Sequence, residues 1–172
     1  FRSQHANATD RDYAEAAIKA GYTEIGFSDH VPYPFPTQYY SDFRMKLNET
    51  EDYVKSIRSL QKEYADRITI RLGFEAEYYP DIFSSLLDFI KPFHYDYLIL
   101  GQHFTNNEYD SGAFYCGHKT NSIEILDKYI SQTLEGLKTG EFLYFAHPDL
   151  IHFTGSREIY KQKMKDFVRE LT

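Results

Sequence analysis

The sequence contains no tryptophan and a single cysteine, and it has neither a long apolar run nor a run of basic residues. Because Cys116 has no second cysteine to pair with, an internal disulfide is excluded and a reducing compartment is favoured. No stretch reaches the roughly 20 apolar residues that a membrane-spanning helix requires, and no signal-like segment is visible. We therefore expect a cytoplasmic protein with no membrane partner.

Positive charge is also scarce, because 19 Lys and Arg residues stand against 26 Asp and Glu residues and give a formal net charge of −7. Proteins that bind the phosphate backbone of nucleic acids usually carry a basic stripe. Nucleic acid is therefore not expected as a partner, and a small molecule is favoured. The sequence leaves the oligomeric state open.

The length of 172 residues suffices for one domain with a sizeable core. It is short for a complete parallel α/β barrel, which typically needs about 250 residues. The chain opens at Phe1 without an initiator methionine, and no further strand follows its last helix-like segment. We expect residues 1–172 to be part of one barrel domain whose first strand and late strands are missing.

Helix-like and strand-like segments alternate along the chain. Apolar spacing and capping residues predict helices over 10–20, 53–64, 81–91 and 159–171, and a further helix between a capping box of Asn121 with Glu124 and a stop at Gly140. Apolar, β-prone runs predict strands over 24–29, 68–74, 95–101 and 141–146. Long loops are expected over 31–48, which contains three prolines, and over 105–120. This strict alternation predicts right-handed crossovers and a parallel sheet.

Four of the apolar segments lead to a residue type that binds metals. IGFSDH ends at His30, ITIRLGFE at Glu75, YLILGQH at His103 and FLYFAH at His147. The C-terminal ends of all strands in a parallel barrel converge on one face, so these four donors would meet in one pocket. The pattern predicts a metalloenzyme.

The other histidines of the middle and late chain, His94, His118 and His152, fall in turns or loops and are interpreted as structural or surface residues. Asp29 precedes His30, and adjacent strand residues point to opposite sides of a sheet. Asp29 is therefore expected either to orient another imidazole or to be structural.

Glu75 closes an apolar strand, where an unpaired carboxylate is costly to bury. A metal ion would remove that cost, and the alternative partner is a basic side chain such as Arg71 on the same face of the strand. Glu77, two residues further on, is expected to serve as a second carboxylate or to bind an amine of the substrate.

The residues resemble the polymerase-and-histidinol-phosphatase (PHP) superfamily, and most closely its monofunctional histidinol-phosphate phosphatases. The resemblance covers nearly the whole chain and depends on the order and separation of five motifs: QHA at 4–6, EIGFSDH at 24–30, LGFEAEYYP at 72–80, LGQH at 100–103 and AHPDL at 146–150. It implies a distorted (β/α)7 barrel, incomplete in this fragment, that binds two to three divalent ions of zinc, iron or manganese.

The resemblance also implies the roles of the matching residues. His5 and His30 correspond to ligands of one metal, Glu75 to a carboxylate that bridges the other two, and His103 and His147 to further ligands, with Glu75, His103 and His147 also catalytic. The H-x-H pair that the family has on its first strand and the D-x-H pair on a late strand would precede Phe1 and follow Thr172.

The reaction implied is hydrolysis of L-histidinol phosphate to L-histidinol and phosphate in histidine biosynthesis, by attack of a metal-bridging hydroxide and without a phosphoenzyme. Clustered cations suit this chemistry because they neutralise developing charge and lower the pKa of bound water. Arg157 is a candidate phosphate clamp, with a solvated helix-start residue as the alternative. Glu77 could attract the substrate's ammonium or imidazole group, and Phe35, Tyr39 or Tyr115 could pack on its imidazole ring.

Two other classes of function remain. A PHP-type nuclease or other phosphoesterase would use similar ligands, although the acidic balance and the long aromatic loops count against nucleic acid. A degenerate metal-binding domain without activity would lack the terminal ligand pairs.

Overall fold

The computed structural model describes residues 8–171 and has an α/β fold. It contains five α-helices, which are α1 (Asp10–Lys19), α2 (Thr50–Glu63), α3 (Phe83–Ile90), α4 (Ile123–Lys138) and α5 (Arg157–Glu170). Its strands are β1 (Glu24–His30), β2 (Thr69–Ala76), β3 (Tyr97–Leu100), β4 (Phe104–Thr105), β5 (Phe114–Tyr115) and β6 (Phe142–Phe145). Two short 3-10 helices, η1 (Leu47–Glu49) and η2 (Lys91–Phe93), complete the elements.

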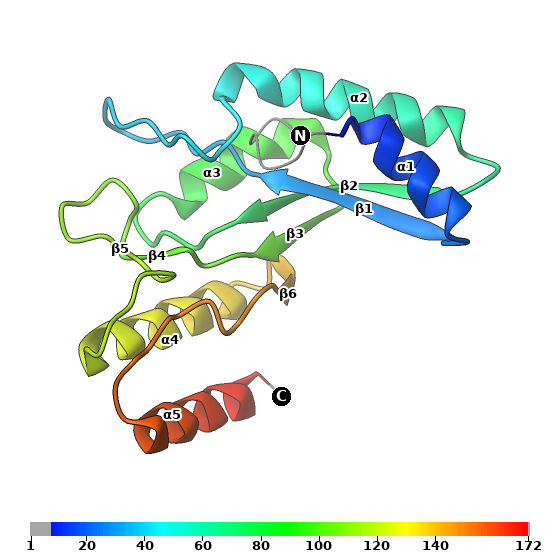
Figure 1. The fold of residues 1–172 in the computed structure, drawn as a ribbon. Helices are drawn as coiled ribbons and strands as arrows, with labels where there is room; N and C mark the ends of the chain where they lie inside the picture. The colour runs from blue at the N-terminus through cyan, green and yellow to red at the C-terminus, as the bar shows by residue number, and fades with distance from the viewer. Residues whose placement is uncertain (1–7, 172) are drawn as a thin grey trace. The chain divides into compact units, whose positions relative to one another are not determined.

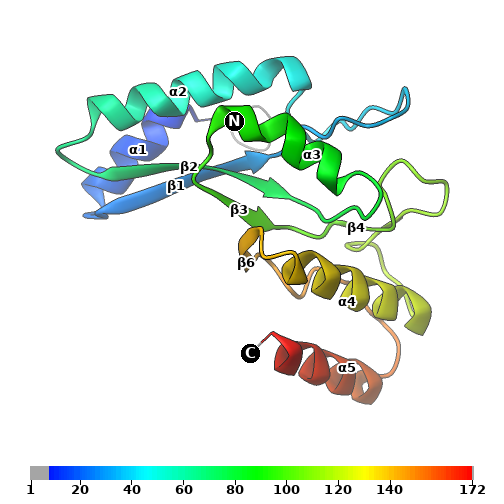
Figure 2. The same ribbon diagram turned by 180° about the vertical axis from the view of Figure 1, so that it is seen from behind.

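Strands β1, β2 and β3 are successive neighbours in one sheet, and β1 pairs in parallel with β2 along the whole of β1. The arrows of β1, β2 and β3 point the same way in both views (Figures 1 and 2). The predicted alternation of helices with a parallel sheet is therefore confirmed. The described residues form two compact units, one that runs to Glu75 and includes Ser84–Ile99, and one that comprises Ala76–Phe83 and continues from Leu100.

In the first unit, α1 and α2 lie side by side, and α2 packs on one face of the sheet (Figure 1). Alternate residues of β2 point toward this helical layer, and Ile70, Leu72 and Phe74 are buried there. The ring of Tyr53 in α2 lies 5.4 Å from that of Phe74, and its hydroxyl donates a hydrogen bond to the carbonyl of Gly73 at 2.9 Å. The intervening residues of each strand occupy the opposite, interior face of the sheet.

The second unit is built around a small apolar core beneath α4. Its buried members are Cys116, Leu126, Tyr129 and Ile151. Helix α5 packs beside α4, and Phe167 of α5 contacts Phe145 of β6 with ring centroids 6.0 Å apart. The amphipathic spacing of these helices is the reason that one stripe of each is buried.

Two local predictions for the second unit were wrong. The loop expected over 105–120 contains a short antiparallel hairpin in which β4 pairs with β5. The N-cap of α4 is Ser122 rather than Asn121, because the Ser122 hydroxyl accepts the N–H of Ile125. Serine and asparagine are similarly good N-caps, so the pattern alone did not separate two adjacent candidates.

Among the helices of residues 8–171, none combines the length and the hydropathy needed to cross a membrane.

Candidate metal centre

His30 and Glu75 are neighbours across the first strand pair. They are register partners at the C-terminal ends of β1 and β2. Because β1 and β2 are parallel and both residues fall on the same face of the pleat, the imidazole and the carboxylate point to the interior face. Both side chains are half-buried. The prediction that strand ends carry metal donors is supported here by an observed pair.

Asp29 belongs to the other face, as the alternation rule predicts. It is 2% exposed, and its Oδ1 accepts the backbone N–H of its neighbour His30 at 2.9 Å. This bond holds the end of β1 in place, which agrees with the structural role that the sequence left open for Asp29.

Arg71 was the expected alternative partner of Glu75. Its Nε donates to Glu24 Oε1 at 2.7 Å, and this contact raises the pKa of the guanidinium above its ordinary value. Both side chains of that pair are about half exposed, so the pair contributes little to stability. Arg71 thus bonds to a carboxylate at the opposite end of the strand pair from Glu75.

The interior face has one feature that sequence reasoning missed. A Cβ atom on Gly26 would lie 2.2 Å from the hydroxyl oxygen of Tyr97, and one on Gly73 would lie 2.5 Å from the same ring. The two glycines therefore admit the ring of Tyr97 against the backbone of β1 and β2. The glycines were visible in the sequence, but their partner comes from another strand.

In the second unit, Glu77 and His103 form a buried pair. Oε1 of Glu77 lies 2.7 Å from Nδ1 of His103, with 0% and 13% of the two side chains exposed. The ring of His147 lies 4.9 Å from that of His103. Because Nδ1 of His103 bonds to a carboxylate, its Nε2 is the nitrogen left to bind a metal.

His147 lies two residues beyond β6 in a left-handed backbone conformation, with φ of 37°. It lines a cavity of about 580 Å³ together with Tyr115, His152 and Tyr160. Tyr115, one of three aromatic residues that the sequence suggested for packing on the substrate's ring, thus lines the same cavity as His147.

The remaining candidates of the sequence analysis have different environments. Arg157 is the exposed first residue of α5 and is not among the residues that line the His147 cavity. His94, His118 and His152 are exposed, and His94 caps η2 with a left-handed backbone. His5 lies outside the residues that the structure describes.

Cys116 is fully buried, and burial raises the pKa of its thiol to about 12. A thiolate is the form that attacks electrophiles or binds metals. Cys116 is therefore a core residue.

The donor types present are suited to a divalent ion of the zinc, iron or manganese group. His30, Glu75 and His103 are each partly buried, and each offers a ligand atom that can bind a metal. Imidazole and carboxylate donors at the ends of parallel strands define a metal-binding protein of the parallel α/β class.

The comparisons with known proteins agree with this class. The family model of the PHP domain matches residues 1–172, and the chain belongs to the PHP family. Among curated relatives, a protein of Deinococcus radiodurans named probable histidinol-phosphatase is 32% identical over 148 residues, which is 85% of this chain and 56% of the relative. The histidinol-phosphatase of Bacillus subtilis is 36% identical over 115 residues, which is 63% of this chain and 42% of the relative.

A solved structure also resembles this fold. The histidinol phosphate phosphatase of Lactococcus lactis, complexed with zinc, L-histidinol and phosphate, superposes with a TM-score of 0.69 at 24% identity, over 97% of this chain and 64% of that one. The chain therefore spans about half the length of the curated relatives described above and about two thirds of this structure.

Proposed function

We propose that the complete protein is a divalent-metal-dependent phosphomonoester hydrolase that converts L-histidinol phosphate and water to L-histidinol and phosphate. The observation that carries this proposal is the pairing of His30 with Glu75 at the ends of two parallel strands. The names of the curated relatives support the choice of substrate. The PHP match over residues 1–172 supports their assignment to one partial barrel domain.

The proposed metal ligands are the five residues of the sequence analysis, His5, His30, Glu75, His103 and His147. Two or three ions of zinc, iron or manganese would be held by this set together with ligands from the rest of the protein. When bound, such ions would supply positive charge for the phosphate oxygens and lower the pKa of water to about 7. An acidic chain can bind a phosphate dianion in this way because the local charge belongs to the ions.

The residues around the ligands have their own tasks in this proposal. Glu77 keeps the proton of His103 on Nδ1, so that Nε2 carries the lone pair needed for metal binding. The full burial of Glu77 supports this positioning role over direct binding of the substrate's amine. Arg157 is proposed as a phosphate clamp, because the forked guanidinium suits recognition of phosphate oxygens.

The decisive experiment uses the complete protein. Treatment with a chelator should abolish phosphate release from L-histidinol phosphate, and zinc, manganese or iron should restore it. Glu75→Gln, His103→Ala and His147→Ala should each lower kcat/KM by roughly a hundredfold or more, whereas His118→Ala, which replaces an exposed histidine outside the proposed ligand set, should not.

Each alternative function predicts another result. A nuclease would release nucleotides from single-stranded DNA faster than phosphate from L-histidinol phosphate. A degenerate domain would bind metal and hydrolyse neither compound. Full activity in the presence of a chelator would contradict the metal-dependent mechanism itself.

A further inference from the structure

A fully buried glutamine, Gln102, directly precedes His103 in the second unit. Its side-chain oxygen accepts the N–H of Tyr78 at 3.0 Å, and its nitrogen donates to the carbonyls of Tyr78 at 3.3 Å and of Phe104 at 2.7 Å. Paired residues of antiparallel strands exchange an N–H and a carbonyl bond in the same way. The amide of Gln102 therefore pairs with Tyr78 as a strand neighbour would.

A second buried glutamine, Gln132 of α4, has the complementary set of bonds and is 2% exposed. Its oxygen accepts the N–H of Asn106 at 2.7 Å, and its nitrogen donates to the carbonyls of Asn106 at 3.0 Å and of Tyr78 at 2.7 Å. Helix α4 also lies directly against this segment, because a Cβ atom on Gly136 would be 2.6 Å from that of Tyr78. We call the side-chain amides of Gln102 and Gln132 the glutamine brace.

The brace surrounds the buried pair of Glu77 and His103. Tyr78 follows Glu77 in the chain, and Gln102 and Phe104 flank His103. The hydrogen bonds of the brace thus fix the backbone next to each partner, and the partners themselves meet at 2.7 Å. Strands β2 and β3 both end before these residues, so side chains rather than strand pairing hold the two segments together here.

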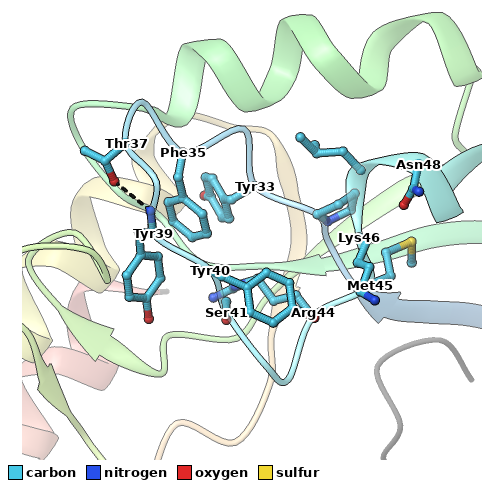
Figure 3. A pocket seen from close by; sticks show the side chains of 12 residues that line it. Tyr33, Phe35, Thr37, Tyr39, Tyr40, Ser41, Arg44, Met45, Lys46 and Asn48 are labelled. Carbon is cyan, nitrogen blue, oxygen red and sulfur yellow. Dashed lines mark hydrogen bonds between the residues drawn. The ribbon is translucent and has the colours of Figure 1, made fainter.

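A side-chain hydrogen bond in the loop between β1 and η1 shows the contrast. This loop encloses a cavity of about 390 Å³ whose lining includes Ser41, Arg44 and several aromatic rings, and there the Thr37 hydroxyl accepts the N–H of Tyr39 at 3.1 Å (Figure 3). That bond spans two residues and shapes one turn. The two glutamines instead bond to a residue 24 and 54 positions away, so they fix distant segments of the chain relative to each other.

Stability alone is a weak reason to bury two glutamines. Burial removes each amide from water and fixes a long side chain, and the net contribution of a hydrogen bond to stability is small because water offers the same bonds in the unfolded state. Geometry is what such bonds provide. A hydrogen bond weakens once its heavy atoms are more than about 3.2 Å apart, so the contact of Glu77 with His103 depends on the exact position of both backbones.

We propose that Gln102 and Gln132 are positioning residues of the metal site, which hold the Glu77 carboxylate against Nδ1 of His103 and so orient the imidazole that binds the ion. The inference rests on the proposed function, because it takes His103 as a metal ligand. Both glutamines act through Glu77 and contact neither the ion nor the substrate.

The test is a double-mutant cycle in zinc affinity, measured on the complete protein by competition with a chromophoric chelator. Gln102→Met nearly keeps the volume of the side chain and removes its amide, and it should lower the affinity about tenfold. In a Glu77→Gln background the same change should lower the affinity by less than about twofold, because the contact that the brace maintains is already impaired. A purely structural role would give the same loss in both backgrounds.

Gln132→Met is the second variant of the brace. It should lower the zinc affinity roughly fivefold, as expected for the loss of about one hydrogen bond, because Gln102 still bonds to Tyr78. This variant tests the proposal independently if Gln102→Met does not fold.

Gln61→Met is the matched control. Gln61 of α2 is partly buried, and its amide also donates to a backbone carbonyl, that of Ile70, at 2.8 Å. Its replacement should lower the midpoint of urea unfolding, as the brace variants do, but should change the zinc affinity by less than about twofold.

The possible results separate the brace from the proposed function. Equal losses with and without Glu77→Gln would overturn the proposal, and so would unchanged zinc affinity in Gln102→Met and Gln132→Met. If the wild-type protein binds zinc but releases no phosphate from L-histidinol phosphate, the proposed function fails, and the zinc cycle still decides the role of the brace. If the wild-type protein binds no zinc, both proposals fail.

Discussion

The carboxylate of Glu77 lies 2.7 Å from Nδ1 of His103, and the Glu77 side chain has no exposed surface. Burying a carboxylate without a partner is costly. The contact with His103 offsets this cost for Glu77. The two residues are 26 positions apart in the chain. Their contact supports the proposal that Glu77 orients an imidazole rather than binding the substrate's amine.

Glu77→Gln should weaken metal binding while the fold is kept. The amide is nearly isosteric but can also turn its NH₂ group toward Nδ1, so it no longer fixes the Nδ1–H tautomer of His103, and the affinity for zinc should fall by about 10- to 100-fold. Competition with a chromophoric chelator measures this affinity. Glu141→Gln, at an exposed glutamate that precedes β6, is the control, and unchanged zinc affinity in Glu77→Gln would contradict the positioning role.

Gly73→Ala should destabilise the protein through a clash with Tyr97. The added Cβ would lie 2.5 Å from the tyrosine ring, and overpacking of this kind costs about 1–3 kcal/mol in the free energy of unfolding. Urea denaturation measures the loss. A second substitution, Tyr97→Ala, should recover part of the added loss in a double-mutant cycle.

The control for that experiment is Gly112→Ala, because the nearest atom to its added Cβ would be 4.0 Å away. If the double mutant loses as much unfolding free energy as the sum of the losses from Gly73→Ala and Tyr97→Ala, the two residues are not coupled.

We expect the buried thiol of Cys116 to make the folded protein less stable at alkaline pH. Burial raises the pKa of its thiol from 9.0 to about 12, so the folded state keeps the proton over a range in which the unfolded state releases it. The contribution of this thiol is complete below pH 9 and is lost as pH rises toward 12. Urea unfolding of wild type and Cys116→Ala across this range should show a steeper decline for wild type, and parallel curves would contradict the assignment.

The same thiol should be unreactive in the native protein. Its reaction with a disulfide reagent at pH 8 should be slow, and it should become rapid in urea, because the thiolate is the reactive form. Rapid labelling without denaturant would show that Cys116 is accessible.

Arg157→Ala tests the proposed phosphate clamp. In the complete enzyme this change should raise KM or lower kcat for L-histidinol phosphate by roughly tenfold or more, as expected for the loss of a charge-assisted hydrogen bond. Lys161→Ala, an exposed change on the same helix, is the control for net charge. Wild-type kinetics in Arg157→Ala would leave Arg157 as the solvated start of α5.

The spacing of apolar residues predicted the helices and longer strands well, because this spacing reflects which face of each segment is buried. The helix predicted over 10–20 is observed at Asp10–Lys19 with Thr9 as its N-cap, and the strand predicted over 24–29 is observed at Glu24–His30. The hairpin of β4 and β5 was missed because two-residue strands are too short to show an alternation.

The sequence by itself determined the class of this protein: the alternation of helices and strands, the position of a metal-type donor after each apolar run, and the order of the PHP motifs. Those properties are local, so they can be read along the chain. Only the tertiary structure decided that Glu77 meets His103, that Tyr97 covers Gly26 and Gly73, and that Ser41 and Arg44 share a cavity with aromatic rings. Side-chain contacts of this kind depend on the packing of elements and on loop conformation, which residue spacing does not specify.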